Sequence, residues 1–226
     1  MYKQLSTLIL LIIFGSITNS ANAYAKENYF VAANSSLFFY DTPKVSKADL
    51  IFDSLRLGRL GLGRRAYDYA MLGYDVLKNK RKLLNDKILS IADMSLPSGK
   101  KRLFVIDVKN YKLLFVTYVA HGKNTGLDKS LFFSNQHESN KSSVGFYTTM
   151  GTYSGAHGYS LRLQGQEIGF NSNALERDIV VHSADYVDES VVKSQGYLGR
   201  SLGCPALSPE IYKPIIDRVT LIISFL

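Results

Sequence analysis

The chain has 226 residues, a single cysteine and a formal net charge of +8. Hydrophobic residues make up 46% and charged residues 20%, which is the composition of a folded protein rather than a disordered one. One cysteine excludes an internal disulfide framework and a cysteine-rich zinc site. The length fits one domain with a short accessory segment.

The first 23 residues have the pattern of a secretory signal peptide. Lys3 precedes an unbroken apolar run over residues 8–14, and Ala21-Asn22-Ala23 form an A-x-A cleavage site. The alternative, an uncleaved membrane anchor, is disfavoured because the run is much shorter than the roughly 20 residues that a span needs. We therefore expect an exported protein that is cleaved after Ala23 and has no membrane span after signal removal.

The positive charge is concentrated between residues 54 and 102. This stretch holds twelve Lys and Arg against four Asp, whereas the rest of the chain after Ala23 is nearly neutral. Two interpretations stay open: a solvated helix face with basic loops, or a patch that holds an anionic polymer. Aromatic residues are sparse in this stretch and no nucleic-acid motif occurs, so we expect no nucleic-acid partner.

The predicted elements begin with a basic, helical N-terminal segment. Residues 24–62 are irregular or weakly helical. From Arg64 to Lys78, apolar or small residues recur in steps of three and four, which indicates one face of an amphipathic helix. These residues are Ala66, Tyr69, Ala70, Gly73, Val76 and Leu77. We place this segment at residues 24–85 and a β-rich domain at residues 86–226.

The β-rich part contains short strands with β-branched and aromatic residues. We expect strands at 88–92, 144–149, 159–163 and 178–182, a hairpin of 103–108 with 113–119, and a closing strand at 221–226. Ser208-Pro209-Glu210 is a typical helix start, because Ser can cap and Pro suits the first helical position. Pro214 should bend or shorten that helix.

The lone cysteine lies in Gly199-Arg200-Ser201-Leu202-Gly203-Cys204-Pro205. A cysteine in such polar, glycine-containing surroundings can act as a nucleophile if a base, usually histidine, removes its proton. Gly203 allows close backbone approach, and successive N–H groups can converge on a developing oxyanion. The alternative is that Cys204 is a small buried hydrophobic residue.

Four histidines are candidates for the base. His182 is the favoured base, because it follows the apolar residues 179–181 at the end of a predicted buried strand, which is a rigid position. His121 also follows a strand and is the second candidate. His137 and His157 lie in loop-like sequence. No i, i+4 histidine pair or His-Glu motif occurs, so we expect no metal site.

Two motifs resemble the signature of YkuD-type L,D-transpeptidase catalytic domains, in particular the murein L,D-transpeptidase branch. They are Val181-His182-Ser183-Ala184-Asp185-Tyr186 and the cysteine motif at residues 199–205. The family has a His-Gly pair and, after a spacer, a Ser-x-Gly-Cys motif. The resemblance extends upstream through blocks within residues 102–163 and covers about residues 50–226.

The resemblance implies a mainly β, sandwich-like catalytic domain, exported to the periplasm or cell-wall compartment of a bacterium. It implies cysteine acyl transfer on peptidoglycan stem peptides through a thioester, with release of D-alanine and without a metal or organic cofactor. Cys204 would be the nucleophile and His182 the base, oriented by the carbonyl of Ser183. The implied oxyanion hole is Gly203 and Cys204 with Leu202. The implied substrate contacts are Ser201, Arg200, Tyr147, Tyr159 and His157.

The sequence departs from the family pattern in ways that touch loop shape and substrate recognition. Ser183 replaces the usual glycine, Leu202 replaces a frequent histidine or tryptophan, and the His-to-Cys interval of 22 residues is longer than in many members. The alternatives are therefore an L,D-carboxypeptidase or amidase-type hydrolase with the same Cys/His pair, and a noncatalytic protein that binds an anionic wall polymer through residues 54–102. The Cys–His pairing also predicts a thiol more acidic than the usual pKa of about 8.5.

Overall fold

A computed structural model describes residues 45–83, 85–219 and 221–225. The expected signal peptide, residues 1–23, and the first part of the expected basic segment lie outside the described residues. Within those described ranges, none of the helices has the length and apolar character needed to cross a membrane.

Eight strands of the described chain pair in the order β3-β2-β1-β8-β4-β5-β6-β7. Neighbouring strands are antiparallel except for the pairs β1–β8 and β6–β7, which are parallel. The expected β-rich fold class is confirmed, and every expected strand is present with shifted bounds. The strands are β1 (Ile88–Asp93), β2 (Leu103–Asp107), β3 (Lys112–Thr117), β4 (Gly145–Gly155), β5 (Gly158–Gly165), β6 (Val180–Ser183), β7 (Ala206–Leu207) and β8 (Leu221–Phe225).

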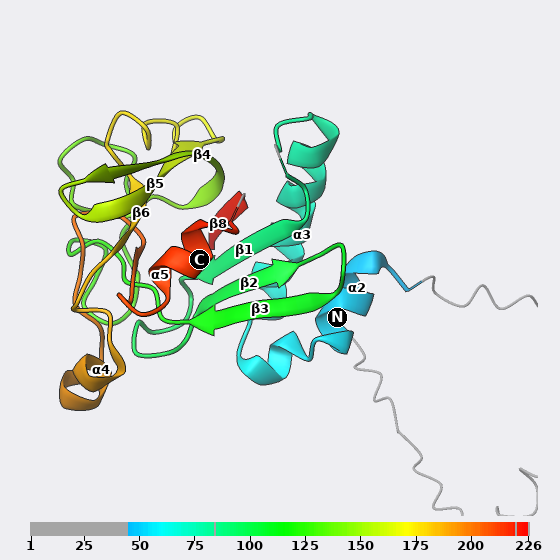
Figure 1. Cartoon of the computed structure of the whole chain (residues 1–226), viewed down its shortest axis with the longest axis horizontal. Coiled ribbons are helices and arrows are strands. Elements are labelled where there is room, and N and C mark those ends of the chain that lie inside the picture. Colours follow the sequence, from blue (N-terminus) through cyan, green and yellow to red (C-terminus); the bar gives the residue numbers. More distant parts are fainter. Residues whose placement is uncertain (1–44, 84, 220, 226) are drawn as a thin grey trace, which may run out of the picture. The chain divides into compact units, whose positions relative to one another are not determined.

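The helices lie mostly toward the N-terminal side of the described chain. They are α2 (Lys47–Ser54), the 3-10 helix η1 (Leu57–Leu60), α3 (Arg64–Asn79), α4 (Glu189–Gln195) and α5 (Tyr212–Ile216). The helix expected from Arg64 is thus confirmed as α3. Figure 1 shows α2 and α3 at the end of the molecule formed by β1, β2 and β3, and α4 at the opposite end.

The β1–β2 hairpin is buried on both faces, because successive side chains of a strand point to opposite sides. Leu89 and Phe104 belong to the core that includes α2 and α3. Leu103 and Val105 belong to a second core, shared with β4, β5, β6, β7 and α5. This second core is the interior of the sandwich, and Cys204 packs against its edge.

Two expectations about the C-terminal part need correction. The strand expected to close the fold, β8, lies in the middle of the sheet between β1 and β4, so it joins the two halves. The helix expected at Ser208 starts later, because Ser208–Ile211 form a turn and α5 begins at Tyr212. Pro214 lies in the first turn of α5, where its missing N–H breaks no helical hydrogen bond.

The buried face of α3 also differs from the expected one. Tyr69 and Val76, expected to be buried, are each 42% exposed, whereas Tyr67 and Tyr74 are buried. The hydroxyls of these two buried tyrosines donate to backbone carbonyls at 2.8 and 2.7 Å. Because those hydrogen bonds satisfy the polar ends, the rings can pack in the core.

Close packing of α3 on β4 depends on Gly73, and it leads to a prediction about stability. An added Cβ at Gly73 would overlap the Phe146 ring. Gly73→Ala should therefore lower the free energy of unfolding by about 1–3 kcal/mol, although the same change in an exposed helix interior stabilises by about 1 kcal/mol. Urea denaturation measures the difference in the free energy of unfolding between Gly73→Ala and the wild type. Gly151→Ala is the control, because nothing lies within 4 Å of its added Cβ; stabilisation by Gly73→Ala would contradict the packing argument.

Candidate active site

Cys204 and His182 are brought together by the pairing of β6 with β7. His182 is opposite Ala206 in this parallel pair, and Cys204 comes two residues before Ala206. Val180, two residues before His182, donates its N–H to the Cys204 Sγ at 3.5 Å. The cysteine therefore lies alongside β6, next to the end that carries the histidine.

The Cys204 thiol makes hydrogen bonds to backbone groups, and not to His182, within the described chain. The thiol donates to the Asp178 carbonyl at 3.6 Å, and no hydrogen bond to His182 occurs among the described residues. Burial raises the pKa of Cys204, while the Val180 N–H and the positive charge of Arg177 lower it in part. The prediction of an unusually acidic thiol is thus wrong for this resting geometry, and a base is needed to activate the sulfur.

The His182 imidazole has the tautomer that a base requires. Its Nδ1–H donates to the Ser183 carbonyl oxygen at 2.8 Å, which leaves the lone pair on Nε2. Burial lowers the pKa of His182, the hydrogen bond to Ser183 opposes this, and His157 lowers it further. The His157 ring stacks on that of His182 with centroids 4.4 Å apart. His182 is consequently neutral near pH 7 and can accept a proton.

The second candidate base, His121, is fully buried and serves a structural purpose. Its Nδ1 accepts from Arg102 at 2.7 Å, and its Nε2 donates to the Gly126 carbonyl at 3.1 Å. Burial and the Arg102 charge lower the pKa of His121 to about 4. With both ring nitrogens engaged, His121 contributes its backbone, because its carbonyl accepts the Ser201 N–H at 3.0 Å.

Residues 201–205, called here the cysteine turn, are stabilised from within by Ser201. The Ser201 hydroxyl donates to the Cys204 carbonyl at 2.6 Å and accepts the Gly203 N–H at 3.0 Å. Gly203 has φ +134°, a conformation that side chains disfavour. Since the Gly203 N–H is engaged, the N–H groups of Leu202 and Cys204, which make no hydrogen bond within the described chain, are the pair free to bind an oxyanion.

Two residues that the sequence does not single out support the cysteine turn. Ser142 donates its hydroxyl to the Gly203 carbonyl at 3.0 Å. Arg177 donates to four oxygens of residues 134–143 at 2.6 to 3.2 Å, and has no carboxylate partner within the described ranges. An added Cβ at Gly203 would lie 3.5 Å from the Arg177 Nη2, so this guanidinium borders the turn. No local sequence pattern marks either residue, because folding alone brings them to the turn.

The remaining residues implied by the resemblance lie in different surroundings. Arg200 is exposed and donates to the Lys123 carbonyl at 3.3 Å. Tyr147 is buried and donates to the Ser143 carbonyl at 2.9 Å, so it belongs to the core and is not exposed to a substrate. The Tyr159 hydroxyl donates to Asp217 at 2.7 Å, outside the cysteine turn. Within the described chain, no cluster of three metal-ligating side chains occurs.

The charge of Arg177 leads to a prediction about thiol reactivity. Because this charge lowers the pKa of Cys204, Arg177→Gln should move the thiol titration to higher pH. The rate of iodoacetamide alkylation against pH measures the midpoint. Arg177→Lys keeps the charge and should move the midpoint less. An unchanged or lower midpoint in Arg177→Gln, with the thermal unfolding temperature preserved, would contradict the electrostatic role.

A family model described as the L,D-transpeptidase catalytic domain matches residues 59–222, which include His182 and Cys204. No protein of curated function matches. Similar solved structures include an L,D-transpeptidase from Mycobacterium smegmatis, with 19% identity and a TM-score of 0.37 over 62% of this chain and 59% of that one. Another is L,D-transpeptidase 1 from Mycobacterium tuberculosis, with 16% identity and a TM-score of 0.34 over 62% of each chain. The chain thus spans less than two thirds of either structure's length.

Proposed function

The chain belongs to the family of L,D-transpeptidase catalytic domains, and we propose on this premise that it is a cysteine acyltransferase acting on peptidoglycan stem peptides. The observation that carries the proposal is the His182 imidazole. Its Nδ1 is fixed by the Ser183 carbonyl, its Nε2 has no hydrogen bond to any described residue, and it stands on the strand beside the partly exposed Cys204. That arrangement suits a general base next to a nucleophile.

The reaction starts with a rotation of the Cys204 side chain from the Asp178 carbonyl toward His182. His182 takes the thiol proton, and Sγ attacks the carbonyl carbon that bears D-alanine in the donor stem peptide. The N–H groups of Leu202 and Cys204 stabilise the oxyanion. The intermediate collapses to a thioester, and the D-alanine amine leaves with the proton from His182.

The second half of the reaction regenerates the thiol. An acceptor amine attacks the thioester while His182 removes a proton from its nitrogen. Collapse of the tetrahedral intermediate forms the new amide bond, and the Cys204 thiolate takes the proton back from His182. If water replaces the amine, the same steps give an L,D-carboxypeptidase.

Incubation with disaccharide-tetrapeptide, followed by mass spectrometry, tests the proposal. A cross-linked dimer with release of D-alanine is expected. Formation of disaccharide-tripeptide without dimer would show that the enzyme hydrolyses the thioester and does not transfer it to an amine. A carbapenem, which resembles the donor stem peptide, should add its mass to Cys204 and should not modify Cys204→Ala. Absence of adduct and of both products would overturn acyl transfer and leave a noncatalytic wall-binding protein.

We further propose that the protein is exported to the periplasm or the cell-wall compartment of a bacterium. The support is the signal-peptide pattern of residues 1–23. N-terminal sequencing of the protein recovered from an expressing bacterium should begin at Tyr24. An intact N-terminus in the cytoplasm would contradict export.

A further inference from the structure

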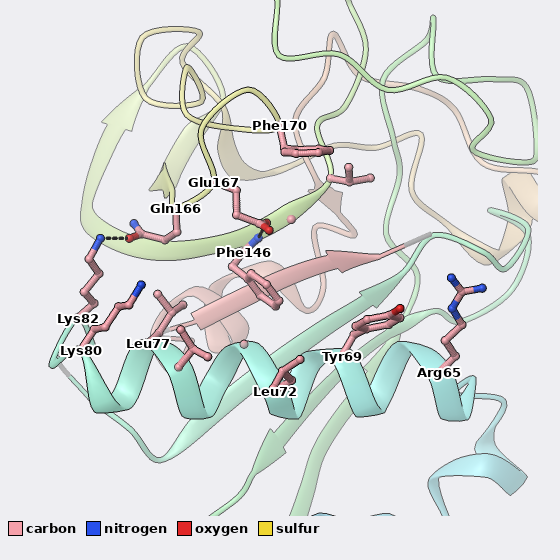
Figure 2. Close-up of a pocket in the computed structure, with 14 residues that line it drawn as sticks. Arg65, Tyr69, Leu72, Leu77, Lys80, Lys82, Phe146, Gln166, Glu167 and Phe170 are labelled. Carbon is pink, nitrogen blue, oxygen red and sulfur yellow. Dashed lines mark hydrogen bonds between the residues drawn. The ribbon is translucent and has the colours of Figure 1, made fainter.

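A long apolar groove lies between α3 and the start of β4, and its lining includes no residue of the cysteine turn. Its volume is about 730 Å³. Tyr69, Leu72 and Val76 of α3 form one wall, and Phe146 and Phe170 contribute to the other. Figure 2 shows Tyr69 and Leu72 on α3, with Phe146 and Phe170 across the space above the helix. Leu72 and Phe170 are 60% and 62% exposed, so a large apolar surface faces the groove without a covering element among the described residues.

The groove is elongated and has positive charge at both ends. Its lining follows α3 from Arg65 to Lys80, a span of roughly 22 Å at the helical rise of 1.5 Å per residue. Figure 2 shows Arg65 at one end and Lys80 and Lys82 at the other. A molecule with one charged head and one apolar tail would use only one of these ends. The spacing instead fits an extended ligand with an acidic group toward each end and an apolar middle.

The cations of the groove have no acidic partner among the described residues. Arg65 lies over the Tyr69 ring at 5.6 Å, and Lys82 donates to the Gln166 side chain at 3.1 Å. Within the described ranges, neither these two residues nor Lys80 makes a salt bridge. Among the described lining residues there is one acid, Glu167, and its carboxylate accepts the Phe146 N–H at 2.9 Å. The net charge of the lining is therefore positive, in the most basic stretch of the chain.

We infer that this groove holds a peptidoglycan strand at a second site, separate from the site of acyl transfer. The inference rests on the proposed function, because it assumes that this polymer is what the protein meets. Peptidoglycan repeats the chemistry that the groove offers: sugar faces and methyl groups for the aromatic and aliphatic walls, and regularly spaced carboxylates for Arg65, Lys80 and Lys82. Binding here would keep the enzyme on the polymer while Cys204 works on one stem peptide.

Co-sedimentation with purified sacculi tests the inference. The mature chain carrying Cys204→Ala is used, so that no turnover or thioester contributes to retention. The double variant Lys80→Glu/Lys82→Glu should bind about tenfold more weakly. The control Lys109→Glu/Lys112→Glu makes the same charge change on two exposed lysines, one in the β2–β3 turn and one at the start of β3, and should bind like the parent. An equal loss of sacculus binding in both double variants would mean that binding depends on overall charge, and it would overturn the inference of a specific site.

A second pair of variants removes apolar contact without a charge change. Leu72→Gln in the groove should weaken binding, whereas Leu50→Gln on α2, similarly exposed at 51%, should not. If Lys80→Glu/Lys82→Glu fails to fold, the comparison of Leu72→Gln with Leu50→Gln still tests whether the groove binds peptidoglycan. Sacculi stripped of stem peptides should bind the parent more weakly, because the carboxylates are lost.

Three results would overturn the inference. One is that polyglutamate competes with sacculi for the protein as well as soluble peptidoglycan fragments do, which would mean a general site for acidic peptides. Another is a change of sedimentation coefficient in Leu72→Gln, which would mean that a second copy of the chain covers the groove. The third is undiminished binding of both groove variants. These results are independent of acyl transfer, because the carbapenem adduct at Cys204 is measured separately and does not need the groove.

Discussion

Replacing His182 with alanine is expected to lower the rate of Cys204 acylation by about 10²- to 10⁴-fold, the usual contribution of a general base. The resting thiol is protonated, because burial raises the pKa of Cys204 and its hydrogen goes to the Asp178 carbonyl. Without the imidazole, nothing in the cysteine turn removes that proton. Mass spectrometry of carbapenem adduct against time gives the rate directly.

The matched control is His137→Ala, which removes an exposed histidine outside the site. The His137 side chain is 54% exposed and lies 3.6 Å from Glu176. Its variant should acylate at the wild-type rate. Equal rates in His182→Ala and wild type, with the thermal unfolding temperature of both preserved, would remove His182 from the mechanism.

The same base should determine how the acylation rate of the wild-type enzyme falls at low pH. Protonated imidazole cannot take the thiol proton, so acylation should fall as the pH drops through the pKa of His182. Burial lowers that pKa below the ordinary value of 6.5. The acid-limb midpoint of the acylation rate should therefore lie below pH 6.5 and should be absent in His182→Ala. A midpoint above 6.5 would mean that another group controls the limb.

The strands and the main helix follow from the sequence because their signals are local. A run of apolar residues at 103–106 marks β2, and apolar or small residues recurring in steps of three and four mark α3. The central place of β8 does not follow, because a strand pattern contains no information about which strands will flank it. The short helix α4 was not foreseen for a related reason: it has no buried residue, so it leaves no hydrophobic period to detect.

The sequence points to Cys204 and His182, which lie on adjoining segments in the structure, but it does not predict what surrounds them. In the sequence, His121 and His182 both come after strand-like runs, and only the tertiary contact of His121 with the buried Arg102 distinguishes them. The resting pKa of the thiol depends first on burial and then on the Val180 N–H and the charge of Arg177, none of which a motif encodes. Arg177 reaches the cysteine turn through residues 134–143, a contact across 34 to 43 positions of sequence.

Gly203→Val is expected to lower turnover by about 10²- to 10³-fold, the effect of losing oxyanion stabilisation. Gly203 has φ +134°, and an added Cβ would lie 2.9 Å from the Lys141 carbonyl and 3.2 Å from the Ile179 side chain. A β-branched residue cannot keep this conformation, so the backbone must shift and move the N–H groups of Leu202 and Cys204. Production of cross-linked dimer from disaccharide-tetrapeptide measures turnover.

The control for Gly203→Val separates backbone strain from loss of the oxyanion site. Gly196 ends α4 with φ +86° and has nothing within 4 Å of an added Cβ, so Gly196→Val imposes comparable strain outside the cysteine turn. Both variants should lose about 1–3 kcal/mol of stability, and only Gly203→Val should lose turnover. Iodoacetamide alkylation requires no oxyanion hole and should continue in Gly203→Val. If turnover by Gly203→Val equalled that by Gly196→Val, the oxyanion would have to be stabilised elsewhere than at the cysteine turn.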